Sequence, residues 1–173
     1  MIRKILFSLC LFFYSSFALA EQKIVILDIE KVLSSSLAAK HASETIKKRL
    51  DTYQLEINKK SDELKIEQEE LISQTNILTQ EVLQEKQASF IGKLKSLEKE
   101  VQVKKKELDG LYVKAIAEIE KSIDTIVKEL SEKEDYNIVM AKSEVIHFRN
   151  VTDISSQVLG VLNKRLKKVN VEI

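Results

Sequence analysis

The chain has 173 residues and is almost neutral, with 28 lysines and arginines against 27 aspartates and glutamates. A net charge of +1 argues against nucleic-acid binding that depends on a strongly basic surface. The sequence has no proline and only three glycines, while 32% of its residues are charged. Because helix breakers are so rare among these charged residues, we expect long, solvent-exposed helices.

Residues 1–20 have the three-part layout of a secretory signal peptide. Arg3 and Lys4 precede a long apolar run, and Ala18 and Ala20 supply the small-x-small pattern of a cleavage site at its end. The run is shorter than the roughly 17–25 residues that cross a bilayer, so a membrane anchor is disfavoured. We expect cleavage after residue 20 and export to the periplasm. Cleavage removes Arg3 and Lys4, which lowers the net charge from +1 to −1, and it removes Cys10, the only cysteine.

The first element after the leader is a short strand, and a long helix follows it. Residues 23–28 form an apolar, β-branched run, and the serines at 34–36 offer N-cap side chains for a helix over about residues 37–73. One apolar row in this stretch repeats every seven residues, as in a coiled coil, at Leu50, Ile57, Leu64, Leu71 and Leu78. A second row, which includes Tyr53, fails at Lys60, so the apolar seam is strongest near its base.

The polar residues 73–76 interrupt the helical pattern and predict the turn of a hairpin. Apolar residues then resume at spacings of three, four and seven, at Phe90, Leu94, Leu97, Val101, Leu108, Leu111 and Ala115. The fold-back places Tyr53 near Val101, in an arm about 45–60 Å long. Gly92 and Gly110 lie inside the second helix, where they either allow the arm to flex or are tolerated or close-packed positions.

The C-terminal third changes from a helical to a mixed pattern. Past Tyr112 the apolar stripe widens, which is typical of a helix that enters a globular core. Strand patterns follow at residues 137–141 and 144–149, and Thr152 is the expected N-cap of a last helix. The sequence therefore predicts an α+β, mostly helical fold, with a long antiparallel helical hairpin that projects from a small β-containing body. We assign the body to residues 21–45 and 116–173, and the arm to residues 46–115 with its tip near 73–76.

No constellation of residues indicates catalysis or a bound metal. His41 and His147 are the only histidines, and neither has a carboxylate or a second histidine at ligand spacing. The serines at 34–36 lack the glycine context of a nucleophile, and no glycine-rich loop could hold a phosphate. We therefore expect a binding protein without enzymatic activity, cofactor or metal.

The order and spacing of these elements carry a family resemblance over the whole chain after the leader. Residues 23–28, the charged hairpin, residues 137–141 and residues 151–155 together resemble the Skp/OmpH family of periplasmic holdase chaperones. The resemblance implies a jellyfish-like homotrimer, in which the bodies share a small β-barrel and the arms enclose a cavity. It also implies that unfolded outer-membrane proteins bind in this cavity without ATP and are kept from aggregating. Unpaired sheet edges and a hairpin with a thin seam independently favour self-association.

The residues expected to make these contacts are mostly apolar positions on the body and the arm. For trimerisation we expect Ile24, Val25, Ile26, Leu27, Ile138, Val139, Met140, Ile146 and Phe148. For client contact we expect arm residues off the main seam, namely Leu55, Ile66, Ile72, Ile77, Val82, Ile91 and Val103. The near-neutral charge departs from the basic arms of the family, so a weak contact with anionic lipid or lipopolysaccharide carries over only to Lys104, Lys105 and Lys106.

The alternative hypothesis is a structural role. An envelope spacer or adaptor hairpin that bridges other proteins needs no cavity. It predicts one defined partner at the tip, residues 73–76, instead of many unfolded clients.

Overall fold

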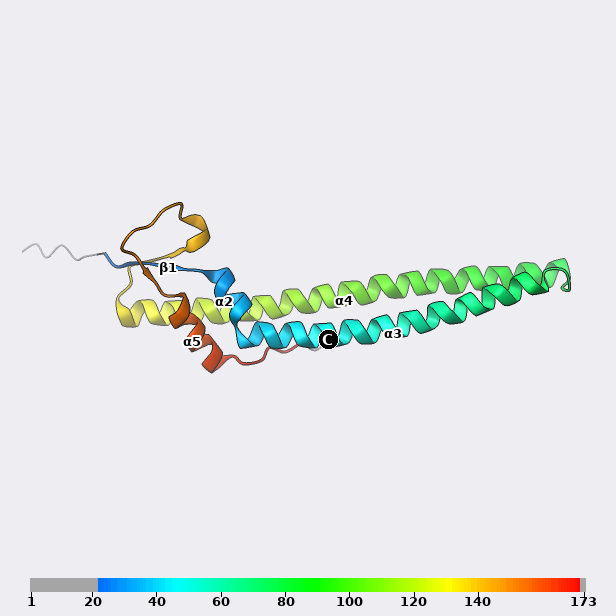
Figure 1. Ribbon diagram of the computed structural model, residues 1–173, viewed down its shortest axis with the longest axis horizontal. Coiled ribbons are helices and arrows are strands. Elements are labelled where there is room, and N and C mark those ends of the chain that lie inside the picture. Colours follow the sequence, from blue (N-terminus) through cyan, green and yellow to red (C-terminus); the bar gives the residue numbers. More distant parts are fainter. Residues whose placement is uncertain (1–21, 172–173) are drawn as a thin grey trace, which may run out of the picture.

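The computed structural model describes residues 22–171, so the expected leader at 1–20 lies outside the described residues. Its elements in chain order are β1 (Ile24–Leu27), α2 (Ile29–Ser35), α3 (Leu37–Gln74), α4 (Gln80–Glu134), β2 (Ile138–Ala141), the 3₁₀ helix η2 (Lys142–Glu144), β3 (Thr152–Asp153) and α5 (Ser155–Arg165). Figure 1 shows a small body at one end, from which α3 and α4 run out as a long hairpin. The expected mostly helical fold with a projecting hairpin is thus confirmed.

A short parallel sheet lies at the centre of the body. Its strand order is β2-β1-β3, and β1 pairs in parallel with both neighbours. Ile26 of β1, for example, is in register with Met140 on one side and with Asp153 on the other. The sheet therefore joins the start of the described chain to its C-terminal third, as the strand patterns suggested.

The predicted strand at residues 144–149 is wrong. Residues 142–144 form η2, residues 145–149 have no regular structure, and the third strand is at 152–153. β1 pairs with β2 and with the shorter strand at 152–153, and residues 145–149 join neither outer edge of this sheet. The 3₁₀ helix at 142–144 takes the place of the tight antiparallel turn that was expected at 142–143. The apolar residues that resembled a strand lie at the surface instead, as Ile146 does.

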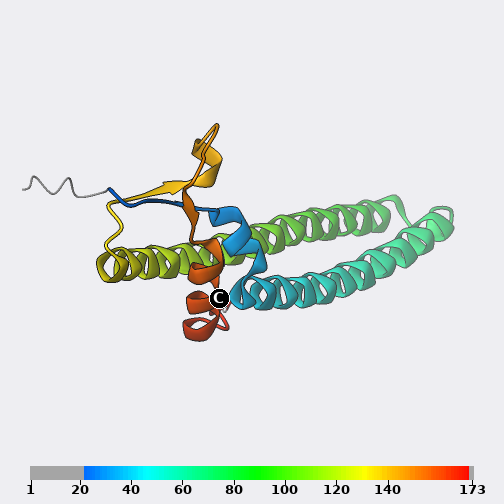
Figure 2. The same cartoon turned by 60° about the vertical axis from the view of Figure 1, so that its left-hand side comes forward.

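The hairpin turn lies slightly later in the chain than expected. α3 begins where the Ser36 hydroxyl accepts a hydrogen bond from the N–H of Ala39, and it ends at Gln74. Residues 75–79 connect it to α4, against an expected turn at 73–76. α4 stops at Asp135, whose left-handed backbone (φ 59°) breaks the helical hydrogen bonding. Figure 2 shows that the hairpin is curved and that its two helices meet again at the tip.

The hydrophobic core lies at the base of the hairpin. One face of α4 is buried there at helical spacing, at Leu111, Ala115, Ile119, Ile123, Ile126 and Leu130. Val25 of β1, Val32 of α2 and Leu162 of α5 belong to the same cluster. Leu111 and Ala115 lie within the segment assigned to the arm, so the core includes the base of the arm. The division of the chain at residues 45 and 116 stays a prediction.

The predicted N-cap at Thr152 is also wrong, because Thr152 pairs with Val25 as part of β3. α5 starts at Ser155, and Asp153 supplies the acceptor there. The Oδ1 atom of Asp153 accepts hydrogen bonds from both the N–H and the hydroxyl of Ser155. The buried Ser155 hydroxyl in turn accepts the Asp28 N–H at 2.8 Å. One serine hydroxyl therefore connects the ends of β1 and β3 to the start of α5.

Candidate functional site

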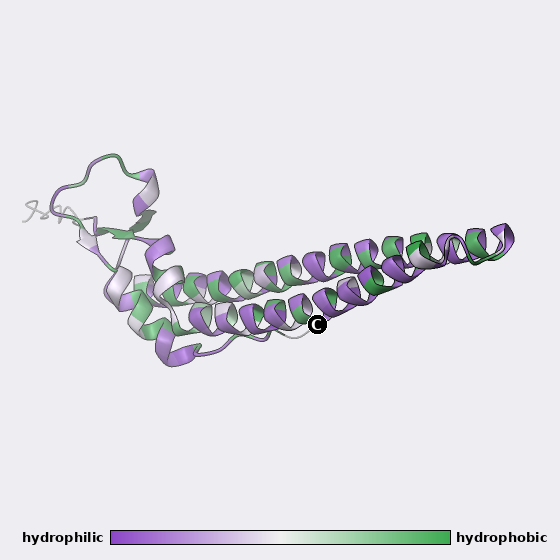
Figure 3. Ribbon diagram, turned by 45° about the vertical axis from the view of Figure 1, so that its right-hand side comes forward, coloured by the Kyte–Doolittle hydropathy of each residue, from purple (hydrophilic) through white to green (hydrophobic). Residues whose placement is uncertain are grey.

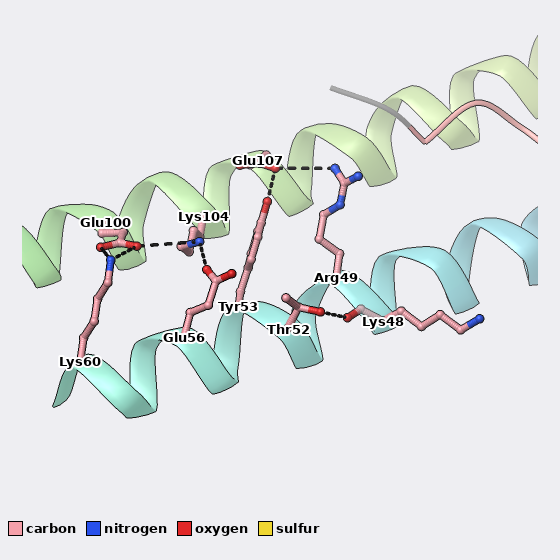
Figure 4. Close-up of polar contacts among 9 residues, drawn as sticks. All are labelled: Lys48, Arg49, Thr52, Tyr53, Glu56, Lys60, Glu100, Lys104 and Glu107. Carbon is pink, nitrogen blue, oxygen red and sulfur yellow. Dashed lines mark hydrogen bonds and ion pairs between the residues drawn. The ribbon is translucent and has the colours of Figure 1, made fainter. Parts of the chain in front are cut away.

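Polar side chains connect α3 and α4 in the middle of the arm (Figure 4). The hydroxyl of Tyr53 donates to Glu107, and the Lys104 Nζ atom lies 3.9 Å from the centroid of the Tyr53 ring. Arg49 approaches the same Glu107 carboxylate at 3.6 Å. Tyr53 and Val101 line one groove between the helices, as expected, but the direct partners of Tyr53 lie closer to the body end of α4. Long side chains that reach across the seam therefore replace simple apolar packing in this stretch.

Lys60, which interrupts the apolar seam, and Lys104 on the facing helix form ion pairs across the seam. Lys60 Nζ lies 2.6 Å from the Glu100 carboxylate. Lys104 Nζ lies 2.7 Å from Glu56 and 3.8 Å from Glu100, so the four residues form one network (Figure 4). Ion pairs between solvent-exposed side chains contribute little to stability, because water and salt screen the charges. The network therefore aligns the two helices but holds them together only weakly.

The network shifts the pKa values of its members in the directions expected for close opposite charges. The hydrogen bond from Lys60 lowers the pKa of Glu100, and the charges of Lys60 and Lys104 act in the same direction. The hydrogen bond to Glu56 raises the pKa of Lys104. The hydrogen bond that the Tyr53 hydroxyl donates to the Glu107 carboxylate raises the pKa of that phenol. Each shift favours the charged carboxylate and lysine and the neutral phenol, which are the forms that make these contacts at neutral pH. Acid weakens the network because it protonates the carboxylates.

All seven aliphatic residues expected to contact clients are exposed on the arm. Their exposed fractions range from 39% at Val82 to 80% at Ile77, and the others are Leu55, Ile66, Ile72, Ile91 and Val103. Figure 3 shows hydrophobic positions interspersed with hydrophilic ones along both helices of the hairpin. The arm thus presents scattered apolar side chains to its surroundings, and client contact at them stays a prediction.

The nine residues expected at a trimer interface divide into two groups. Val25, Ile26 and Leu27 are at most 3% exposed, and Val25 and Leu27 belong to the core of their own chain. Val139 is half-buried, while Ile24, Ile138, Met140, Ile146 and Phe148 are exposed. The second group is the part of this surface that another copy could reach directly.

The three lysines expected to contact anionic lipid are not equivalent. The side chain of Lys104 is only 18% exposed and is neutralised by two glutamates. Lys105 and Lys106 are exposed and form no ion pair within the described part of the chain. Only these two offer an uncompensated charge, and a lipid contact at them stays a prediction.

Sequence reasoning missed an apolar groove at the base of the arm. The groove has a volume of about 810 Å³ and lies between α2, α3 and α4. Leu33, Ala39 and Tyr112 line it, together with Val113, whose side chain is 65% exposed. The sequence feature that could have predicted this groove is the run of small residues at the start of α3, where Ala39 and Ala42 leave space between the helices.

Within residues 22–171, no three histidine, cysteine, aspartate or glutamate side chains are grouped as they would be around a metal ion. In the same part of the chain, no helix combines the length and apolar character needed to cross a membrane. The features that stand out are therefore the arm, the exposed apolar residues of the body and the grooves between the helices.

Comparison with known proteins places this architecture in a family. The family model described as outer membrane protein (OmpH-like) matches residues 23–162, and the chain therefore belongs to the OmpH-like family, whose members are periplasmic, non-enzymatic chaperones. Among solved structures, a crystal structure of an OmpH-like protein from Caulobacter crescentus CB15, described as a candidate outer membrane chaperone, has a TM-score of 0.80 and 18% sequence identity. The match covers 87% of this chain and 89% of that one, and at this identity it establishes a shared fold. No curated protein matches the chain.

Proposed function

We propose that this protein is an ATP-independent periplasmic holdase that binds unfolded outer-membrane proteins between the arms of a homotrimer and prevents their aggregation. The observation that carries the proposal is the exposure of seven aliphatic residues along a hairpin that projects from a small body. α3 alone has 38 residues and so extends about 57 Å at 1.5 Å per residue. An unfolded chain can meet many of these side chains at once.

The expected weakness of each contact explains why clients can be released without ATP hydrolysis. Full burial of an aliphatic side chain contributes roughly 1.5–3 kcal/mol, and partial burial on a helix surface contributes less. A handful of such contacts together reach about −8 kcal/mol, which corresponds to micromolar affinity. Because each contact is weak and breaks rapidly, a client that begins to fold elsewhere can leave the arms stepwise.

The body supplies the grounds for proposing a trimer. β2 and β3 are the outer strands of a three-stranded sheet, and unpaired edges favour association with another chain. Ile138 and Met140 on β2 are exposed, as are Ile146 and Phe148 after it. Burial of these side chains between copies would cover four of the large apolar groups that the body leaves exposed. Three arms around one axis would then enclose the client.

The test is a variant that removes arm contacts without disturbing the fold. Leu55, Ile66 and Ile72 are exposed, so their joint replacement by serine should leave helicity and oligomeric state unchanged. We expect the variant to suppress aggregation of an unfolded outer-membrane protein less well, with the half-effective concentration raised about tenfold.

The control replaces three exposed glutamines of the arm by serine, two on α3 and one on α4. Gln54, Gln68 and Gln102 are exposed, and their replacement lowers helix propensity in the same way without removing apolar contacts. Equal suppression by the arm variant, the control and the unchanged protein would contradict the proposal. It would favour the adaptor hypothesis, in which the hairpin tip binds one defined partner.

A further inference from the structure

A groove between α3 and α4 near the tip combines apolar and acidic side chains. It has a volume of about 400 Å³. Ile66 and Leu71 supply the apolar part, and Glu63, Glu67 and Glu70 supply three carboxylates. We call this the distal groove. It is open to an extended polypeptide that lies along the hairpin.

The carboxylates of the distal groove are largely uncompensated. Glu67 pairs with Lys93 at 2.7 Å, but Glu63 and Glu70 are exposed and form no ion pair within residues 22–171. Lys86, the only lysine that lines the groove, donates to the side-chain oxygen of Gln74. The whole segment 61–92 carries seven acidic residues and two lysines, which gives it a net charge of −5.

The proximal part of the arm has the opposite sign. Residues 93–106 carry six lysines and two glutamates, and residues 46–60 on α3 carry five cationic and two acidic residues. The groove in that part, about 570 Å³, is lined by Lys104 and Lys105 beside apolar residues. The arm is therefore polarised along its length, acidic toward the tip and basic toward the body.

The negative charge of the distal groove determines which kinds of ligand can bind there. An anionic membrane surface is repelled by it, and the distal arm of a second copy carries the same charge. The unpaired carboxylates of Glu63 and Glu70 attract lysine or arginine side chains of an extended segment, and Ile66 and Leu71 offer apolar surface to its apolar side chains.

We propose that the distal groove is a subsite for cationic amphipathic segments of unfolded polypeptides, so that the arm sorts client segments by charge along its length. This inference rests on the proposed holdase function and specifies the chemistry of the segments held near the tip. It also implies that segments of the opposite sign are held closer to the body.

The test measures binding of two fluorescent peptides of equal length, one alternating valine with lysine and one alternating valine with glutamate. We expect the valine–lysine peptide to bind more tightly at low salt, and its advantage to disappear at high salt. The double variant Glu63→Gln, Glu70→Gln should weaken its binding about three- to tenfold, because exposed charge pairs are individually modest. The control Glu118→Gln, Glu132→Gln removes the same charge from exposed positions nearer the body, and its binding should stay unchanged.

A fluorophore locates the contact. The sole cysteine, Cys10, lies in the expected leader, so Ser89→Cys gives a chain starting at residue 21 a single thiol in the distal groove. The valine–lysine peptide should change the emission of a label there, and the Glu63→Gln, Glu70→Gln pair should remove that change.

Three outcomes would overturn the inference. They are equal binding of the two peptides, equal weakening by the distal and control variants, and binding to phosphatidylglycerol vesicles that depends on Glu63 and Glu70. Parallel light-scattering measurements with an unfolded outer-membrane protein separate this inference from the proposed function. If clients are held but the peptides are not distinguished, only the inference is wrong. If the peptides are distinguished but clients aggregate freely, only the holdase function is wrong.

Discussion

Replacement of Ser155 by alanine tests how the body is held together. The Ser155 hydroxyl accepts the Asp28 N–H at 2.8 Å and donates to Asp153, and the residue is only 2% exposed. Alanine removes both hydrogen bonds and leaves the Asp28 N–H, at the end of β1, without an acceptor. The loss of a partner by a buried donor costs about 1–3 kcal/mol, so we expect a loss of about 2 kcal/mol. For a domain of this size that corresponds to a fall in Tm of about 4–8 °C.

The assay is thermal unfolding followed by circular dichroism at a fixed protein concentration, since association changes apparent stability. The adjacent Ser156 is exposed and makes no hydrogen bond through its side chain within residues 22–171, so Ser156→Ala is the matched control. A Tm for the Ser155 variant within 1 °C of this control would refute the reasoning. The change should also raise the pKa of Asp153 toward its ordinary value, because the Ser155 hydroxyl is the main cause of its lowering.

The remaining predictions concern the arm and the core. The pKa of Glu100 is lowered in the folded state, so its contribution to stability is present above the ordinary carboxyl pKa and is lost as pH falls through the folded value. Spin labels on the two helices near Lys60 should therefore separate in acid, and Glu100→Gln should show the wider distance already at neutral pH. An added Cβ at Gly92 or Gly110 meets nothing within 4 Å, so alanine at each should raise the urea midpoint, by up to about 1 kcal/mol of stability. A lowered midpoint would contradict this. Ile119 is fully buried in the core, and Ile119→Ala should cost about 2–5 kcal/mol in urea unfolding, whereas a cost below 1 kcal/mol would show that the base of α4 is loosely packed.

The helical hairpin was readable from the sequence because its signals are local. The leucines from Leu50 to Leu78 recur every seven residues, and this period specifies one helix face without any knowledge of distant contacts. The uncharged stretch around residue 75 interrupts the charged helices and marks the turn to within a few residues. Exposure of the off-seam residues, such as Ile66 and Ile77, follows from the same periodicity.

The sheet and the arm network were less predictable because they depend on residues far apart in the chain. Residues 144–149 contain β-branched and aromatic residues, yet the strand that pairs with the second edge of β1 is the shorter one at 152–153. The ion pair between Lys60 and Glu100 depends on the register of two long helices, which a shift of a few residues at the turn would change. Neither feature leaves a signature within a single stretch of sequence.

The central claim is that this protein holds unfolded outer-membrane proteins, and a stoichiometric aggregation assay tests it most directly. A urea-unfolded outer-membrane barrel protein is diluted into buffer with increasing amounts of the chain from residue 21 onward, and light scattering is recorded. We expect that scattering is suppressed without ATP and that suppression saturates near three chains per client. Undiminished scattering at excess protein would contradict it and would direct attention to a defined partner for the hairpin tip.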